Sequence, residues 1–257
     1  MHGHIVLAVS SVVLAAGSSI GSEQFEVEFV ADDGECVRGP LMTHWHLLLR
    51  CSGRPVRSFP SYRGQRSCSG WWWLSRSRTH VGYESWLERD NLMLLDADPC
   101  VMLVVSQPFW LYWRDASRWR RHVPDFLVRY HGGAVAVVDV RAEDRVEAGD
   151  AEVFVVTARA CELVGWHFRR VGVVDAVLAA NLRWLSGYRH PRNHVEPSAS
   201  RLASVFTAER ELSQGCRAVG DPIAVLPTLF HLLWTGHLIA DLAGELLNER
   251  TLLRTRP

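Results

Sequence analysis

The stretch Val123–Arg141, which reads VPDFLVRYHGGAVAVVDVR, decides the fold of this chain. Two apolar runs flank His131–Gly133, and glycines between two strand-like runs are typical of a tight β-hairpin. A three-residue loop sets a register in which Asp125 faces Asp139. Directly opposed residues share one face, with Cβ atoms about 4.5–5.5 Å apart. The pattern therefore predicts two carboxylates side by side near the open end of the hairpin.

This pair of carboxylates predicts a metal site. Two like charges directly opposite each other destabilise a strand pair, and a divalent cation between them reverses the sign of that interaction. Carboxylate oxygens are the ligands that Mg²⁺ prefers. Arg141 lies two residues beyond Asp139 and is expected on the same face. A loop of two or four residues would put Asp125 and Asp139 on opposite faces, so the hypothesis depends on the loop length.

The residues around the hairpin predict a mixed α/β domain over 25–190. Their order is helix, three or four strands, helix, strand, with an Arg-rich connection before the hairpin. The expected strands are 25–29, 101–105, 109–113, 126–130, 134–141 and 166–171; the expected helices are 82–96 and 151–164, and the connection is 114–122.

The character of the sequence changes beyond residue 172. We expect a helix over 176–185, a loop over 187–197 and further helices over 199–210 and 222–234, the last broken or kinked at Pro227. Short strand-like pieces follow to the end. Short helices closing into a small hairpin resemble a winged helix, and we place this C-terminal helical module at 191–257.

The amino-acid composition limits which reactions and metal sites the chain can support. The chain has 257 residues, and its 28 basic and 28 acidic residues cancel. Every basic residue is Arg, so mechanisms that need a lysine amine are excluded. The six cysteines form no C-x-x-C pair, which argues against a zinc ribbon and favours reduced, mostly buried thiols in a cytoplasmic protein.

The first 24 residues are expected to lie outside the fold. Residues 5–16 form an apolar run of the length of a signal peptide, but no Arg or Lys precedes it, and it is too short to span a bilayer. We therefore expect 1–24 to be a disordered extension, or to precede the true start of the protein. An export signal remains the alternative.

Arginines and aromatic residues are interspersed in one early segment of the chain. Between Arg38 and Tyr83 there are eight arginines and no acid, with Trp71–Trp73 inside this block. Such a block is typical of a surface that binds the phosphate backbone and exposed bases of a nucleic acid. It is equally typical of an ordinary solvent-exposed surface whose tryptophans are buried in the core. A weaker candidate is a metal site at His44 and His46, which are expected to share a strand face but lack a third ligand.

Several phrases carry a family resemblance. The hairpin matches the nuclease motif P-D…(D/E)-x-K, with Arg141 in the lysine position, and Glu84 is expected on the upstream helix. Together with the surrounding phrases, the chain resembles the TnsA-like endonuclease subunit of heteromeric transposases, most closely over 58–145 and more loosely to about 245. The phrases are Ser61–Gln65 (SYRGQ), Gly82–Ser85 (GYES), Ser106–Phe109 (SQPF) and His122–Phe126 (HVPDF).

The resemblance implies a restriction-endonuclease-like fold that cuts double-stranded DNA at transposon ends. It also implies a partner transposase for strand transfer and allows an ATP-dependent regulator, with no membrane partner. Glu84, Asp125 and Asp139 would hold one or two Mg²⁺ or Mn²⁺ ions, and the Val140 carbonyl would add a ligand.

The arginines have separate expected roles. Arg141 cannot act as a base, because a guanidinium is effectively never deprotonated, so it is assigned to stabilising charge in the transition state. Arg118, Arg120 and Arg121, on a loop before Asp125, and Arg63 are expected to bind DNA. Because Arg141 stands where the nuclease motif has lysine, an alternative stays open: a catalytically impaired module of the same fold that binds DNA or a partner.

Overall fold

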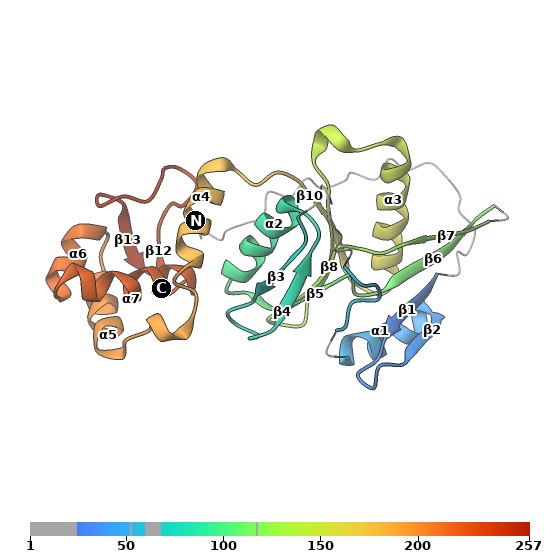
Figure 1. Ribbon diagram of the computed structural model, residues 1–257, viewed down its shortest axis with the longest axis horizontal. Helices are drawn as coiled ribbons and strands as arrows, with labels where there is room; N and C mark the ends of the chain where they lie inside the picture. The colour runs from blue at the N-terminus through green and yellow to red at the C-terminus, as the bar shows by residue number, and fades with distance from the viewer. Residues whose placement is uncertain (1–24, 52, 60–67, 117) are drawn as a thin grey trace. The chain divides into compact units, whose positions relative to one another are not determined.

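The computed structural model describes residues 25–51, 53–59, 68–116 and 118–257 (Figure 1). The chain forms two compact units. The first comprises the described residues up to Trp73 together with 79–91 and 100–173, and the second comprises 74–78, 92–99 and 174–257. The second unit therefore includes 174–190, which the sequence assigns to the first domain. The N-terminal extension expected over 1–24 lies outside the described residues.

The central sheet of the first unit contains the hairpin. Its strand order is β10-β9-β8-β5, with β9 and β10 parallel and the other neighbours antiparallel. A parallel pair needs a crossover, and α3 provides it between β9 and β10. The mixed α/β class and the order helix, strands, helix, strand are as predicted. The elements are α2 (Trp86–Ala97), β5 (Val101–Ser106), β8 (Phe126–Tyr130), β9 (Val135–Val140), η1 (Glu143–Arg145), α3 (Ala148–Leu163) and β10 (His167–Val171).

The register of the β8–β9 hairpin is the predicted one. Phe126 pairs with Val138, and the Tyr130 N–H donates to the Ala134 carbonyl oxygen at 2.9 Å. The loop turns through two glycines in the left-handed region, at φ +86° and +88°. Because the ladder ends at Phe126, the next residue outward on each strand is an aspartate.

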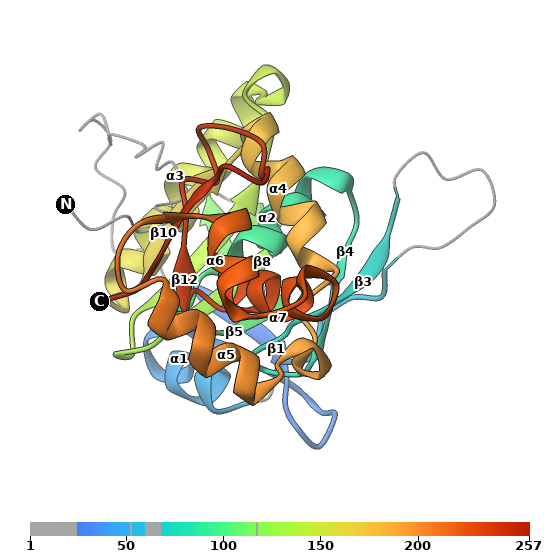
Figure 2. The ribbon, with the colours of Figure 1, turned by 90° about the vertical axis from the view of Figure 1, so that its left-hand side faces the viewer.

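Both faces of this sheet are covered. Phe126, Val128 and Val137 have no exposed surface, which explains why β8 and β9 read as nearly continuous apolar runs. Figures 1 and 2 show α3 beside the strands of this sheet. On α2, the Asn91 side chain donates to the carbonyl of Gly172, just past the end of β10, at 2.9 Å.

A second sheet, ordered β2-β1-β6-β7, packs its inner face into the same core. Two expectations are wrong here. Residues 114–122 are not a connection, because they form the end of β6 and all of β7. His44 and His46 lie on a helix rather than a strand. The elements are β1 (Glu26–Val30), β2 (Cys36–Pro40), α1 (Leu41–Arg50), β6 (Trp110–Asp115) and β7 (Arg118–His122).

A short hairpin precedes α2. Strand β3 (Gly70–Trp73) pairs with β4 (His80–Tyr83), and α2 starts only at Trp86. The expected helix over 82–96 therefore begins too early. Glu84 lies in the turn between β4 and α2 and not on the helix.

The second unit runs helix, helix, strand, helix, helix, strand, strand. Its sheet has the order β11-β13-β12 with antiparallel pairs. The last long helix continues through Pro227, so the expected break is absent. The elements are α4 (Ala176–Ser186), η2 (Pro191–Asn193), α5 (Glu196–Val205), β11 (Arg210–Glu211), α6 (Leu212–Val219), α7 (Pro222–Trp234), β12 (Leu238–Ile239) and β13 (Leu252–Thr255).

Two segments from earlier in the chain complete the second unit. Trp234 on α7 is 2% exposed, and its indole Nε1–H donates to Ser75 Oγ at 3.1 Å. Ser75 in turn donates through Oγ to Asp96 at 2.9 Å. These bonds tie 74–78 and 92–99 to α7.

Two general expectations can be compared with the structure. None of the six cysteines, all of which lie in the described part of the chain, forms a disulfide, but only Cys161 and Cys216 are buried, so the expectation of mostly buried thiols is wrong. None of the helices among the described residues combines the length and the apolar character needed to cross a bilayer.

Candidate metal centre

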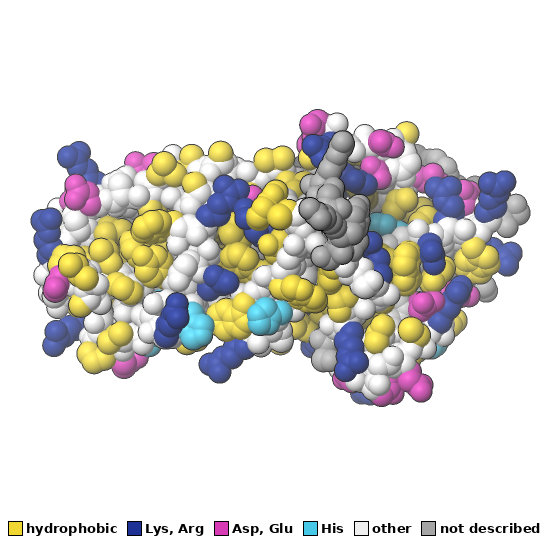
Figure 3. Space-filling model, in the orientation of Figure 1, with side chains coloured by type: hydrophobic (Ala, Val, Ile, Leu, Met, Phe, Trp, Pro, Cys, Tyr) yellow, Lys and Arg dark blue, Asp and Glu magenta, His cyan; other side chains and the backbone are white. Residues whose placement is uncertain are grey.

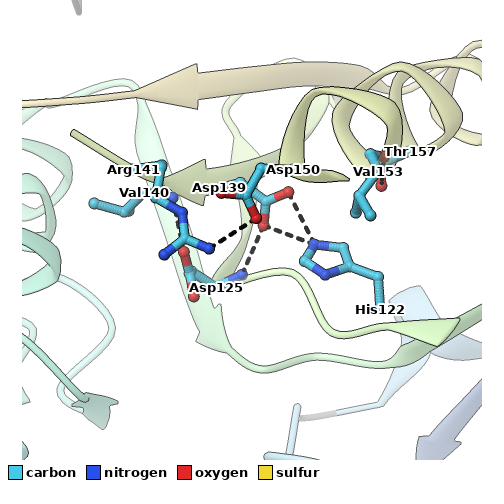
Figure 4. Close-up of polar contacts among 8 residues, drawn as sticks. All are labelled: His122, Asp125, Asp139, Val140, Arg141, Asp150, Val153 and Thr157. Carbon is cyan, nitrogen blue, oxygen red and sulfur yellow. Dashed lines mark hydrogen bonds and ion pairs between the residues drawn. The ribbon is translucent and has the colours of Figure 1, made fainter. Parts of the chain in front are cut away.

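Asp125 and Asp139 meet at the open end of the β8–β9 hairpin (Figure 4). Asp125 Oδ2 accepts a hydrogen bond from the Val140 N–H at 2.7 Å. The Asp125 N–H donates to Asp139 Oδ1 at 3.3 Å. Backbone groups at the strand ends therefore fix both side chains next to each other.

The pKa of Asp125 is raised well above its usual range. Burial is the largest cause, followed by the charges of Asp139 and Glu88, while the hydrogen bond from Val140 opposes the shift and the charge of Glu84 adds to it. Ionising Asp125 therefore requires placing a charge among three other carboxyl groups. Such a site favours a proton or a cation.

Glu84 and Glu88 form the acidic turn before and at the start of α2. The Glu84 N–H donates to Glu88 Oε2 at 2.7 Å, and Glu84 Oε2 lies 2.5 Å from Arg57 Nη2. The other oxygen, Glu84 Oε1, is buried and has no hydrogen-bond partner among the described residues. The pKa of Glu88 is raised by burial first, and the charge of Glu84 adds to the increase.

Asp139 is 3% exposed and is held by His122. The His122 Nε2 atom lies 3.1 Å from Asp139 Oδ1 and 2.9 Å from Oδ2. His122 is the last residue of β7, so the second sheet supplies the partner of an aspartate on the first. No sequence pattern predicts this pair, because the contact depends on residues 118–122 forming a strand.

Arg141 forms an ion pair with α3. Its Nη2 lies 3.0 Å from Asp150 Oδ1, and about half of its side-chain surface is exposed. Asp150 also completes a capping box with Glu147 at the start of α3. The guanidinium is thus tied to the helix beside the two aspartates (Figure 4).

The predicted DNA-binding arginines lie on a strand and not on a loop. Arg118, Arg120 and Arg121 are exposed on β7, an edge strand, and Figure 3 shows basic side chains gathered over the projecting end of β6 and β7. Arg120 Nη1 lies 3.4 Å from Asp115, and the Arg121 guanidinium lies 4.2 Å from the Trp110 ring centre. Arg63 lies outside the described residues.

The donor set fits a hard divalent cation in part. Within the residues the structure describes, no three His, Cys, Asp or Glu side chains are already arranged to ligate an ion. The oxygen donors are nevertheless of the right kind, because Glu84 Oε1 is buried without a partner and Asp125 is repelled by its neighbours. The Val140 N–H is engaged with Asp125, and a role for its carbonyl stays a prediction.

The structure thus brings Glu84, Asp125 and Asp139 to one region. It adds Glu88 and His122, which the sequence analysis missed. For Glu88 a signal existed, since the sequence predicts a helix over 82–96, and residues four apart on a helix share a face.

No protein-family model matches the chain, and a search of curated proteins finds no relative above the significance threshold. A fold alone does not determine function. The function is therefore inferred from the chemistry of the site.

Proposed function

We propose that the chain is a metal-dependent DNA endonuclease of the PD-(D/E)XK type, the nuclease subunit of a TnsA-like heteromeric transposase. One observation carries this proposal. Asp125 is held beside Asp139 at the end of a buried hairpin, with its pKa raised by burial and by neighbouring carboxylates. An apoprotein that keeps such repulsion is suited to bind a cation there.

The order of elements supports the proposal. We propose that the order α2, β5, β8, β9, α3, β10 forms a restriction-endonuclease-like core, with the β6–β7 hairpin inserted between β5 and β8. In the second unit, we propose that the order α5, β11, α6, α7, β12, β13 forms a winged helix. Both folds occur in proteins that handle DNA.

The proposed cofactor is Mg²⁺ or Mn²⁺, one or two ions. Glu84, Asp125 and Asp139 would hold it, with the Val140 carbonyl as a further ligand and Glu88 next to them. A bound ion would lower the pKa of a water molecule and stabilise the leaving oxygen.

The chain's own residues have separate roles. His122 fixes the orientation of Asp139 through both carboxylate oxygens. Arg141 stabilises negative charge on the phosphate. Its guanidinium must leave the ion pair with Asp150 to contact the substrate. Arg118, Arg120 and Arg121 on β7, together with Arg63, bind the DNA backbone.

The proposed substrate is double-stranded DNA at transposon ends. Strand transfer would belong to a separate transposase, and an ATP-dependent regulator is a further proposed partner. We propose the cytoplasm as the compartment, which suits six described cysteines that form no disulfide.

The test is the effect of Mn²⁺ on thermal unfolding. A ligand that binds only the folded state adds about 2.7 kcal/mol at 100 times its Kd. We expect Mn²⁺ to raise the unfolding midpoint of the wild type and not that of Asp125→Asn. Asp144→Asn removes an exposed carboxylate nearby and serves as the matched control, with the full Mn²⁺ shift. Equal shifts in all three proteins would show that the ion binds elsewhere.

Cleavage is the second readout. We expect Mn²⁺-dependent nicking of transposon-end DNA, together with the partner transposase, to disappear in Asp125→Asn and to persist in Asp144→Asn. A metal shift without nicking under any of these conditions would favour a site that binds but does not cut.

A binding module without catalysis is the second candidate. It is favoured by the Arg141–Asp150 ion pair, because the group in the lysine position is occupied by α3. This candidate predicts DNA binding that is the same in the wild type and Asp125→Asn, with no Mn²⁺ shift in either protein.

A further inference from the structure

A shallow groove of about 630 Å³ lies within the second unit and shares no lining residue with the candidate metal centre. It surrounds the turn between α7 and β12. Four basic side chains from separate segments line it: Arg76, His194, His237 and Arg256. Nothing in the proposed nuclease mechanism uses these residues.

Local bonds hold two of these side chains in place. Gly236 has φ +74°, and a Cβ built on it would lie 3.2 Å from Arg256 Nη2, so the guanidinium lies against the turn. The Arg256 N–H donates to the His237 carbonyl at 3.0 Å. The His237 ring Nδ1 lies 2.8 Å from the Thr235 hydroxyl. The turn is thus built around a histidine and an arginine.

The positive charge of the groove is compensated only in part. Among the ion pairs of the described residues, none includes Arg76 or Arg256. Glu196 lines the groove, but its carboxylate is bonded to His194 at 2.8 Å and to Ser200 at 2.9 Å. Burial lowers the pKa of His237, and the charges of His194, Arg76 and Arg256 lower it further. His194 and the two arginines therefore disfavour a positive charge on the His237 ring.

We propose that this groove is an anion site for a phosphate-bearing ligand, with the phosphate held by Arg76, Arg256 and His237. Guanidinium groups match phosphate oxygens with a planar fork of donors. Leu232 and Leu238 form an apolar part of the lining, which suits an attached sugar or base. The volume lies in the range of small-ligand sites. A nucleic-acid backbone and a free nucleotide share this chemistry.

The site has a defined pH dependence. His237 faces His194, Arg76 and Arg256, and the Thr235 hydroxyl bonds its Nδ1. His194 in turn faces Glu196 and the ring of His231, whose centre is 5.7 Å away. A bound anion favours the protonated imidazole, so binding takes up protons. Affinity therefore rises as the pH falls from about 7.5 to about 5.5.

The test is isothermal titration calorimetry on the full chain, with three probes: inorganic phosphate, ADP and a short DNA duplex. The variant Arg76→Gln/Arg256→Gln removes both guanidinium groups. We expect its affinity for phosphate to fall about tenfold for each arginine lost. Arg201→Gln/Arg250→Gln makes the same change at two exposed arginines of the same unit outside the groove lining, and should bind like the wild type.

The probes distinguish the two sources of phosphate. ADP binding that the groove variant loses, without competition from the duplex, assigns a free nucleotide; competition by the duplex assigns a nucleic-acid backbone. Sulfate, whose charge is fixed over this pH range, checks the pH dependence and should shift the His237 ring resonances. Equal affinities in the groove and control variants, or no binding of any probe, would overturn the proposal.

Failure of this site can be separated from failure of the proposed nuclease. The groove variant leaves the carboxylates of the first unit untouched. It is therefore expected to keep the Mn²⁺ shift of the unfolding midpoint.

Discussion

At the scale of single residues, Asp125 sets how the first unit responds to pH. Its pKa is raised in the folded state, mainly by burial and by the charge of Asp139. The folded protein therefore holds a proton that the unfolded chain releases at lower pH. It follows that stability falls as the pH rises from the unfolded pKa of about 4 towards the folded value.

We predict that Asp125→Asn removes this part of the pH dependence. With EDTA present, the variant should be more stable than the wild type near neutral pH, by about 1.4 kcal/mol for each unit of the pKa shift. Urea unfolding over a pH series measures the difference. Asp144→Asn should follow the wild-type curve, and Glu88 contributes its own slope to all three proteins. Parallel curves for Asp125→Asn and wild type would contradict the prediction.

Residue patterns reveal only part of this site. Asp125 and Asp139 could be predicted to meet, because a short hairpin fixes which residues face each other. His122 could not, because its contact with Asp139 joins two sheets. The ion pair between Arg141 and Asp150 likewise depends on where α3 packs. Local register can be derived from sequence, whereas contacts between elements require the tertiary structure.

At the scale of elements, the β8–β9 loop depends on its glycines. Gly133 has φ +88°, and a Cβ there would meet nothing within 4 Å. A substitution therefore tests backbone strain alone. We predict that Gly133→Ala destabilises the protein by about 1–2 kcal/mol, because L-residues avoid the left-handed region.

Gly149 is the matched control for this prediction. It also has open space around its Cβ position, but it lies in α3 without a positive φ. Gly149→Ala should stabilise the protein by up to about 1 kcal/mol, because alanine favours a helix. Chemical denaturation of both variants measures the two effects. The same sign for both would show that the loop conformation is not what requires glycine.

Elements differ in how well the sequence predicts them. The strands β5, β8 and β9 are apolar and buried, so their residues alone indicate strands. Strand β7 reads RWRRH and has no apolar alternation, and it exists because it pairs with β6. Residues 41–50 were not predicted as a helix, and two histidines in them were misassigned to a strand. Edge and surface elements are set by their partners.

At the scale of the whole molecule, the chain passes between its two units several times. The composition changes near residue 191, yet the second unit starts at Val174 and also takes residues 74–78 and 92–99. Asn181 on α4 shows why: its side-chain amide donates to the carbonyls of Leu242 and Glu245 at 2.8 Å. A boundary based on composition cannot detect this contact.

This arrangement predicts that the first unit is not released by cutting at a single position. Leu92, Met93 and Leu95 on α2 are almost fully buried and belong to the second unit. A chain that ends at Val173 would expose them, which removes about 1.5–3 kcal/mol of burial for each. Domains are stable by only about 5–15 kcal/mol in total. We therefore expect this truncated chain to bind a hydrophobic dye and to unfold well below the full chain.

A chain that ends at residue 190 distinguishes the two units of the structure from the domain boundary at 191 that the sequence predicts. That chain keeps α4 but lacks α7, so Ser75 loses its hydrogen bond from Trp234 and Asn181 loses both acceptors. We expect it to be no more stable than the chain ending at 173. If the chain ending at 190 unfolded cooperatively at the midpoint of the full protein, residues 92–99 would belong with the first unit, because their burial would not need the C-terminal helices.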